Sequence, residues 1–99
     1  MSDFDYQQLD DIIHSRIRLA VIAVLVTVNE AEFVFLKDKV NATDGNLSTH
    51  LKKLEESGYV AVSKSFEKRK PISRYMLTQK GKKAFEIYVK RLENLIKKN

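Results

Sequence analysis

The segment from Thr43 to Gly58 constrains the fold more than any other part of this sequence, because it marks both ends of a helix. Thr43 is a residue type that caps helix N-termini, and Gly58 is a residue type that ends helices in the left-handed conformation. Leu47, Leu51 and Leu54 recur at helical spacing and form one apolar stripe. The sequence therefore predicts a capped helix that buries its leucines.

The opposite side of this helix is polar and becomes cationic along its length. The residues on this face are Gly45, Ser48, Thr49, Lys52 and, at one flank, Lys53, and Asn46 is a further polar candidate near the helix start. The DNA major groove admits a helix, and there Asn pairs with adenine, Ser and Thr bind several base edges, and Lys reaches guanine. We therefore predict a recognition helix over residues 44–57, with these six residues and Thr43 as DNA contacts. A polar outer face is also typical of any amphipathic helix, and Asn46 also suits a supporting role in the cap.

The composition excludes several classes of protein. Ninety-nine residues with 43% hydrophobic content suffice for a single domain, residues 1–99, and argue against general disorder. Without cysteine there are no disulfides or thiolate metal sites, and we expect a cytoplasmic protein. The acidic start of the chain does not resemble a secretory signal. The apolar run from Leu19 to Val28 is about half the length of a membrane-spanning helix, so we expect no membrane partner.

Charge is unevenly distributed along the chain. The net charge is +5, yet residues 1–11 hold four aspartates and no base, whereas residues 64–74 hold five bases and one acid. A basic cluster of this kind favours a polyanionic partner such as nucleic acid, although a charged loop is also often only solvated. The bases predicted to contact DNA are Lys64, Lys68, Arg69, Lys70 and Arg74. Arg69 is the preferred candidate, because Arg suits the minor groove better than Lys does.

After Gly58 the hydrophobic period changes from helical to alternating, which predicts two strands. The strands cover Tyr59–Phe66 and Ile72–Leu77. The loop between them, Glu67–Pro71, contains the only proline at a place where it would limit neither strand. The sequence therefore predicts a hairpin, or wing, over residues 59–77 with a cationic tip.

Two further amphipathic helices are predicted, over about residues 5–28 and 79–97. The first is apolar on most of its surface, and the second, capped by Thr78, is about 28 Å long, which exceeds what so small a core covers. Surplus apolar surface favours a second subunit, and a two-fold dimer is the commonest arrangement. We therefore predict a homodimer whose interface contains Ile13, Ile17, Tyr88, Leu92, Leu95 and Ile96.

A short strand at Glu32–Phe33 and a helix over Val34–Val40 are predicted before the recognition helix. Two helices joined by a short polar connection are typical of a helix-turn-helix. The predicted fold class is therefore mainly α with a small β-hairpin (α+β): a winged helix-turn-helix with extended N- and C-terminal helices that form a dimer interface.

Five segments carry a family resemblance: Ile13–Leu19, Phe33–Leu36, Thr43–Val60, Lys64–Phe66 with Lys70–Pro71, and Tyr75–Gly81. With these segments the whole chain resembles the small archaeal or bacterial winged-helix transcriptional regulators of the MarR and ArsR groups. The resemblance implies a homodimer on a pseudo-palindromic operator, with repression as the usual outcome. The chain departs from ArsR metal sensors in having no cysteine and only His14 and His50. It also leaves little room for the ligand pocket of larger MarR proteins, so a small-molecule effector stays open.

The sequence thus predicts a sequence-specific regulator that binds double-stranded DNA and needs no metal or other cofactor. We expect no enzyme, because no nucleophile–base–acid set and no phosphate-binding glycine loop is recognisable. The alternative is a winged-helix adaptor that contacts another protein within a larger nucleic-acid complex. Glu55 and Glu56 near the end of the recognition helix keep this alternative open, as does the apolar seam of the last helix.

Overall fold

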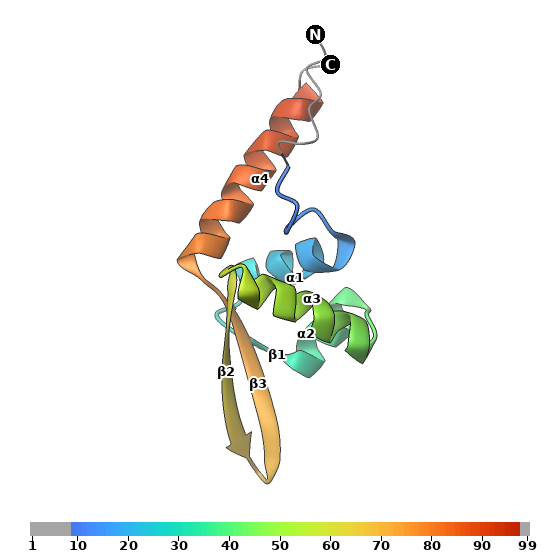
Figure 1. The fold of residues 1–99 in the computed structure, drawn as a ribbon, viewed down its shortest axis with the longest axis vertical. Helices are drawn as coiled ribbons and strands as arrows, with labels where there is room; N and C mark the ends of the chain where they lie inside the picture. The colour runs from blue at the N-terminus through green and yellow to red at the C-terminus, as the bar shows by residue number, and fades with distance from the viewer. Residues whose placement is uncertain (1–8, 98–99) are drawn as a thin grey trace.

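A computed structural model describes residues 9–97 as four helices and a three-stranded antiparallel sheet (Figure 1). In chain order the elements are α1 (Arg16–Thr27), β1 (Ala31–Glu32), α2 (Phe33–Val40), α3 (Asp44–Glu56), β2 (Val60–Glu67), β3 (Lys70–Leu77) and α4 (Gln79–Lys97). The strand order is β1-β3-β2. The α+β winged-helix fold is therefore confirmed. The molecule is elongated, 59 × 26 × 21 Å, because the hairpin and α4 extend from opposite ends of the helical body.

The N-terminal helix is shorter than the sequence predicts. Residues 9–15 form a turn, and residues 5–8 of the predicted helix lie outside the described residues. The Asp10 carboxylate accepts hydrogen bonds from the backbone N–H groups of Ile12 (2.7 Å) and Ile13 (3.3 Å). Such local side-chain bonds compete with helical backbone bonding. The helix α1 therefore begins only at Arg16, after Ser15, whose side chain caps it by accepting from the Arg18 N–H.

The helices α2 and α3 form the helix-turn-helix, joined by residues 41–43. Asn41 ends α2 in the left-handed conformation, with φ 55°. The predicted cap of the recognition helix is present, because the Thr43 side-chain oxygen accepts from the Asn46 N–H at 3.1 Å. Gly58 follows the helix with φ 82°, as the sequence predicts. Each predicted helix boundary in this unit differs from the observed one by at most one residue.

The hydrophobic core lies between the helices and the base of the sheet. It takes the leucines of α3, two side chains of α2 and four of α1, together with Val60 of β2. Tyr88 and Leu95 bring α4 onto the same cluster, with exposed fractions of 3% and 5%. No helix among residues 9–97 is both long enough and apolar enough to cross a bilayer.

The hairpin is longer than predicted and its turn is tighter. The register pairs Glu67 with Lys70, so the connection is only the two residues Lys68 and Arg69. Pro71 therefore lies inside β3, paired with Phe66, and its predicted place in a loop is wrong. Antiparallel pairs alternate in hydrogen bonding, and the pair next to the one that flanks a two-residue turn exchanges no bonds. The missing N–H of Pro71 consequently costs no bond to β2.

The residues of the predicted dimer interface fall into two groups within the protomer. Four of its residues belong to the buried core of the chain itself, with exposed fractions of 7% or less: Ile13, Ile17, Tyr88 and Leu95. Leu92 and Ile96 are 36% and 65% exposed. The apolar stripe of α4 is wide. Tyr88 and Leu95 on one edge cover the core, whereas Leu92 and Ile96 on the other edge face outward. The sequence pattern does not tell these two edges apart.

Candidate nucleic-acid interface

The helix α3 separates its apolar and polar faces completely. Its three leucines are at most 2% exposed, whereas every residue of the predicted DNA-contacting face is exposed, from Thr43 to Lys53. The helix therefore offers to solvent the small hydrogen-bonding residues near its N-terminus and the lysines in its second half. This is the arrangement that a helix needs to approach the major groove.

Local hydrogen bonds already engage some of these polar side chains. The Thr43 oxygen caps the helix, and the Thr49 hydroxyl donates to the Gly45 carbonyl at 3.0 Å. Among residues 9–97, no hydrogen bond engages the side chains of Asn46, Ser48 or Lys52. These three side chains are consequently the ones available to meet base edges. A Cβ built at Gly45 would meet no atom within 4 Å, so the helix N-terminus is open to a ligand on this side.

A groove of about 320 Å³ joins α3 to the wing. Ser48 and Lys52 line it from the helix, and Lys64 and Tyr75 line it from β2 and β3. Because side chains alternate along a strand, the residues of β2 that face α3 are Val62, Lys64 and Phe66. The structure therefore brings Lys64 together with the recognition helix, as expected for one continuous cationic surface.

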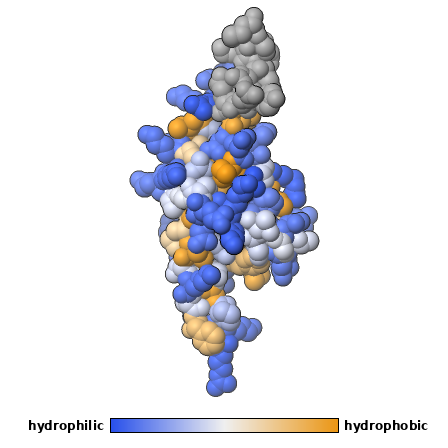
Figure 2. Space-filling view, viewed as in Figure 1, coloured by the Kyte–Doolittle hydropathy of each residue, from blue (hydrophilic) through white to orange (hydrophobic). Residues whose placement is uncertain are grey.

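The free end of the wing is cationic. Lys68, Arg69 and Lys70 are exposed there, and Figure 2 shows hydrophilic side chains at that end with a hydrophobic patch just above them. Lys68 and Arg69 both have positive φ, 50° and 65°, as a type I′ turn requires. Such turns favour Asn-Gly, and left-handed Lys and Arg cost conformational energy. Two strained cations at a projecting tip point to a binding role for this turn.

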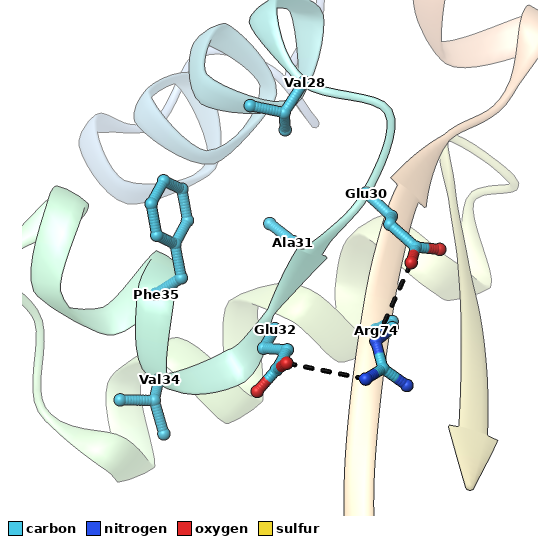
Figure 3. A pocket seen from close by; sticks show the side chains of 7 residues that line it. All are labelled: Val28, Glu30, Ala31, Glu32, Val34, Phe35 and Arg74. Carbon is cyan, nitrogen blue, oxygen red and sulfur yellow. Dashed lines mark ion pairs between the residues drawn. The ribbon is translucent and has the colours of Figure 1, made fainter.

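A separate hollow of about 600 Å³ lies beside β1, where α1 ends and α2 begins (Figure 3). Val28, Ala31, Val34 and Phe35 form its apolar lining, and Val34 is 72% exposed. Glu30, Glu32 and Arg74 supply the polar part of the lining. This hollow shares no lining residue with the groove beside α3, so it is a separate surface.

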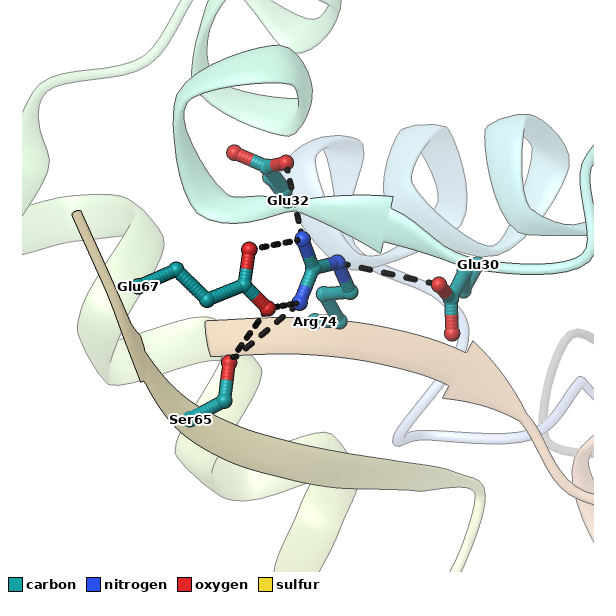
Figure 4. A network of polar contacts seen from close by, with 5 residues as sticks. All are labelled: Glu30, Glu32, Ser65, Glu67 and Arg74. Atoms are coloured by element: carbon teal, nitrogen blue, oxygen red, sulfur yellow. Dashed lines mark hydrogen bonds and ion pairs between the residues drawn. The ribbon is translucent and has the colours of Figure 1, made fainter. Parts of the chain in front are cut away.

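Arg74 lies apart from the other predicted DNA contacts. Its guanidinium donates to both carboxylate oxygens of Glu67, at 2.8 and 3.1 Å, and to the Ser65 hydroxyl (Figure 4). Glu30 and Glu32 pair with the same guanidinium at 3.7 and 3.6 Å. This side chain faces away from α3, because its neighbour Tyr75 faces toward it. Arg74 thus ties β1 to the wing. No local pattern in the sequence indicates this cluster, because its carboxylates come from two distant segments.

The back of α3 is supported by Arg18 of α1. Its guanidinium contacts His50 Nδ1 at 2.8 Å and also donates to the Ile12 and Asp11 carbonyls. His50 is thus half-buried and hydrogen-bonded. The observed partners of the Arg18 guanidinium are two backbone carbonyls and His50. His14 forms a similar link to α4, because its Nδ1 lies 2.9 Å from the Tyr88 hydroxyl.

The Arg18–His50 contact predicts a dependence of stability on pH. Burial, together with the nearby charges of Arg18, Lys53 and Arg16, lowers the pKa of His50 below its usual value of 6.5. The unfolded chain then binds a proton more readily than the folded protein does, so stability falls as the pH drops below 6.5. We expect thermal denaturation to show a smaller loss of stability between pH 7 and pH 5.5 in His50→Gln than in the wild type. Equal losses would contradict this role of His50.

Comparison with known proteins gives consistent matches. Residues 17–96 match a family model described as a winged helix DNA-binding domain. An uncharacterized protein of Methanocaldococcus jannaschii, MJ0432, is 42% identical over 86 residues, which cover 87% of this chain and 94% of that protein. Among residues 9–97, no three His, Cys, Asp or Glu side chains form a group that suits a metal ion.

Solved structures share the same fold. A transcriptional regulator homologue from Pyrococcus horikoshii OT3 superposes with a TM-score of 0.78 at 26% identity, covering 87% of this chain and 85% of that one. A MarR-family transcriptional regulator from Silicibacter pomeroyi superposes with a TM-score of 0.67 at 19% identity, covering 91% of this chain and 57% of that one. At that identity the second likeness concerns the fold alone.

Proposed function

Because this chain belongs to the winged helix DNA-binding domain family, we propose that it is a sequence-specific transcriptional regulator that binds double-stranded DNA as a homodimer. The observation that carries the proposal is that α3 and the wing both expose polar or cationic side chains to solvent. The polar face of α3 and the cationic tip of the wing are both uncovered, and the groove with Lys64 connects them. We further propose repression in the cytoplasm as its mode of action.

The two elements have different tasks in this proposal. The helix α3 enters the major groove, where Asn46, Ser48 and Lys52 meet base edges. The wing follows the backbone into the adjacent minor groove, where Lys68, Arg69 and Lys70 neutralise phosphates or bind the narrow groove. Lys53 and Lys64 flank these contacts as phosphate ligands. Arg74 acts indirectly, by holding the wing against β1 through its carboxylate partners.

The outward edge of α4 supports a two-fold dimer. Val89, Leu92 and Ile96 are 37%, 36% and 65% exposed and follow a spacing of three and four residues, as in a coiled-coil seam. Pairing two such seams removes their apolar surface from water and places two recognition helices about one DNA turn, ~34 Å, apart. The operator is then a pseudo-palindrome with half-sites at that spacing. Leu92 and Ile96 already belong to the interface that the sequence predicts, and Val89 is added in place of its four buried members.

Selection of duplexes from a random DNA pool, followed by titration at several salt concentrations, tests this function. We expect Lys52→Ala to weaken the preferred duplex about tenfold while changing unrelated duplexes little, because one base contact per half-site is lost.

Arg69→Ala should weaken the binding of all duplexes alike. It should also reduce the slope of log affinity against log salt concentration by about 2, because a dimer loses two cations at the DNA. Lys90→Ala on α4 is the matched control and should change neither. Failure of the wild type to bind any duplex at low salt would overturn the proposal.

An adaptor role is the second candidate, and the hollow beside α2 is the observation that favours it. Val34 and Phe35 expose 72% and 41% of their surface there, next to the carboxylates of Glu30 and Glu32. Exposed apolar surface with a polar rim is typical of protein contacts. The mass in solution distinguishes the two functions, because a stable homodimer fits the regulator, whereas a monomer that recruits another protein fits the adaptor.

A further inference from the structure

Phe66 is the one large aromatic residue of the wing that the proposed contacts leave unexplained. It lies in β2, two positions before the turn, and 72% of its surface is exposed. Side chains alternate along β2, so Phe66 faces the same side as Lys64, which lines the groove beside α3. The ring therefore stands on the side of the wing that faces α3, and only Glu67 separates it in sequence from the three tip cations.

The hairpin register fixes the position of Phe66 on the wing. Phe66 pairs with Pro71 across the hairpin, and this pair exchanges no backbone hydrogen bonds. Side chains approach each other most closely at such pairs, so Pro71 is the cross-strand neighbour of Phe66. The tight turn of Lys68 and Arg69 fixes the register. The hairpin projects beyond the helical body (Figure 1), so the exposed Phe66 lies on a cationic finger away from the core.

We propose that Phe66 is an apolar wedge that enters the DNA minor groove and partly unstacks a base step beneath the wing. This role rests on the proposed function and adds a contact of different chemistry to it. Cationic side chains are attracted by phosphates on both sides of the groove, whereas an apolar ring gains only by reaching the sugars and bases at its floor. Minor-groove proteins use Phe, Leu, Ile, Met or Pro in this way and kink the duplex.

The wedge has a consequence for sequence preference. Pyrimidine–purine steps such as TA and CA unstack at the lowest cost, so the wing selects them without hydrogen bonds to base edges. We therefore expect the selected duplexes to carry such a step at a fixed distance outside the α3 contacts in each half-site. Replacement of that step by a stiffer step should reduce affinity for the wild type more than for Phe66→Ala.

A fluorescence experiment tests the wedge directly. 2-Aminopurine is placed at the step beneath the wing in the selected duplex, and its emission, which rises when the base unstacks, is followed during titration. We expect the wild type to raise the emission roughly twofold or more and Phe66→Ala to leave it at the level of free DNA. Phe66→Ala should bind roughly tenfold more weakly, and Phe66→Leu should retain most of the emission change because Leu also serves as a wedge.

Val34→Ala is the matched control, because Val34 is equally exposed, at 72%, but lies beside the hollow at α2. Circular dichroism confirms that each variant is folded. If Phe66→Ala matches Val34→Ala in both affinity and emission, the wedge is overturned while the proposed function stands. A loss of affinity without a change in emission overturns the insertion as well, because the ring then only packs against sugars. No binding by the wild type overturns both proposals.

Discussion

Gly81→Ala is expected to lower the free energy of unfolding by about 3 kcal/mol or more, the largest effect we expect from a single methyl group in this protein. A Cβ at Gly81 would lie 2.2 Å from the Tyr59 carbonyl oxygen and 2.8 Å from Leu77 Cδ1. The Tyr59 carbonyl accepts from the Thr78 N–H at 3.0 Å and is therefore held in place. Because a backbone atom does not turn aside as a flexible side chain does, the first turn of α4 must move as a whole.

Chemical or thermal denaturation followed by circular dichroism measures this effect, at one fixed protein concentration because a dimer makes stability depend on concentration. For a domain of this size we expect the melting temperature to fall by roughly 10–20 °C. Gly45→Ala is the matched control: its Cβ meets no atom within 4 Å, and Ala favours a helix more than Gly does. A Gly81→Ala variant as stable as Gly45→Ala would contradict the observed packing of α4 on Tyr59.

The double substitution of Leu92 and Ile96 by Lys is expected to convert the proposed dimer into a folded monomer. Both side chains lie on the outward edge of α4, so the charges face solvent in the monomer but oppose their copies in a dimer. Affinity for the selected operator should fall by about 100-fold or more, because a monomer loses the gain from binding two linked half-sites. Analytical ultracentrifugation measures the mass, and titration of DNA measures the affinity.

Ile87→Lys provides the control for this prediction. Ile87 is also exposed, at 42%, but it lines a hollow next to Tyr59, on the opposite side of α4 from Leu92 and Ile96. We expect Ile87→Lys to remain dimeric and to bind DNA as the wild type does. A double variant that stays dimeric would place the interface elsewhere. Tyr88 is unsuitable for such a test, because it is buried in the protomer and its loss would disturb the fold.

The elements that the sequence predicts well depend on local information. The cap at Thr43, the stop at Gly58 and the leucine stripe of α3 all lie within one short segment, and the structure confirms each. The change from helical to alternating period likewise located the hairpin. In these cases the residue types themselves favour the observed backbone conformation, so no distant contact was needed to decide it.

Predictions failed where distant segments meet. The turn before α1 is stabilised by Asp10, whose carboxylate also accepts from the Tyr59 hydroxyl, 49 positions away. Burial, together with this contact, raises the pKa of Tyr59 to about 12. Arg74 appeared to belong to a basic cluster, but Glu30 and Glu32 approach it across the sheet edge. The apolar pattern of these regions was correct, but it did not reveal their partners.

Local sequence patterns were enough to predict the fold class, the position of α3 and the positive charge at the wing, because capping, periodicity and charge are properties of neighbouring residues. The packing of separate elements was needed to show which edge of α4 is free, which cation of the wing is held by carboxylates and which side of the hairpin carries Phe66. These features depend on how separate elements pack against one another. A helix or strand presents the same pattern in sequence whichever of its sides another segment covers.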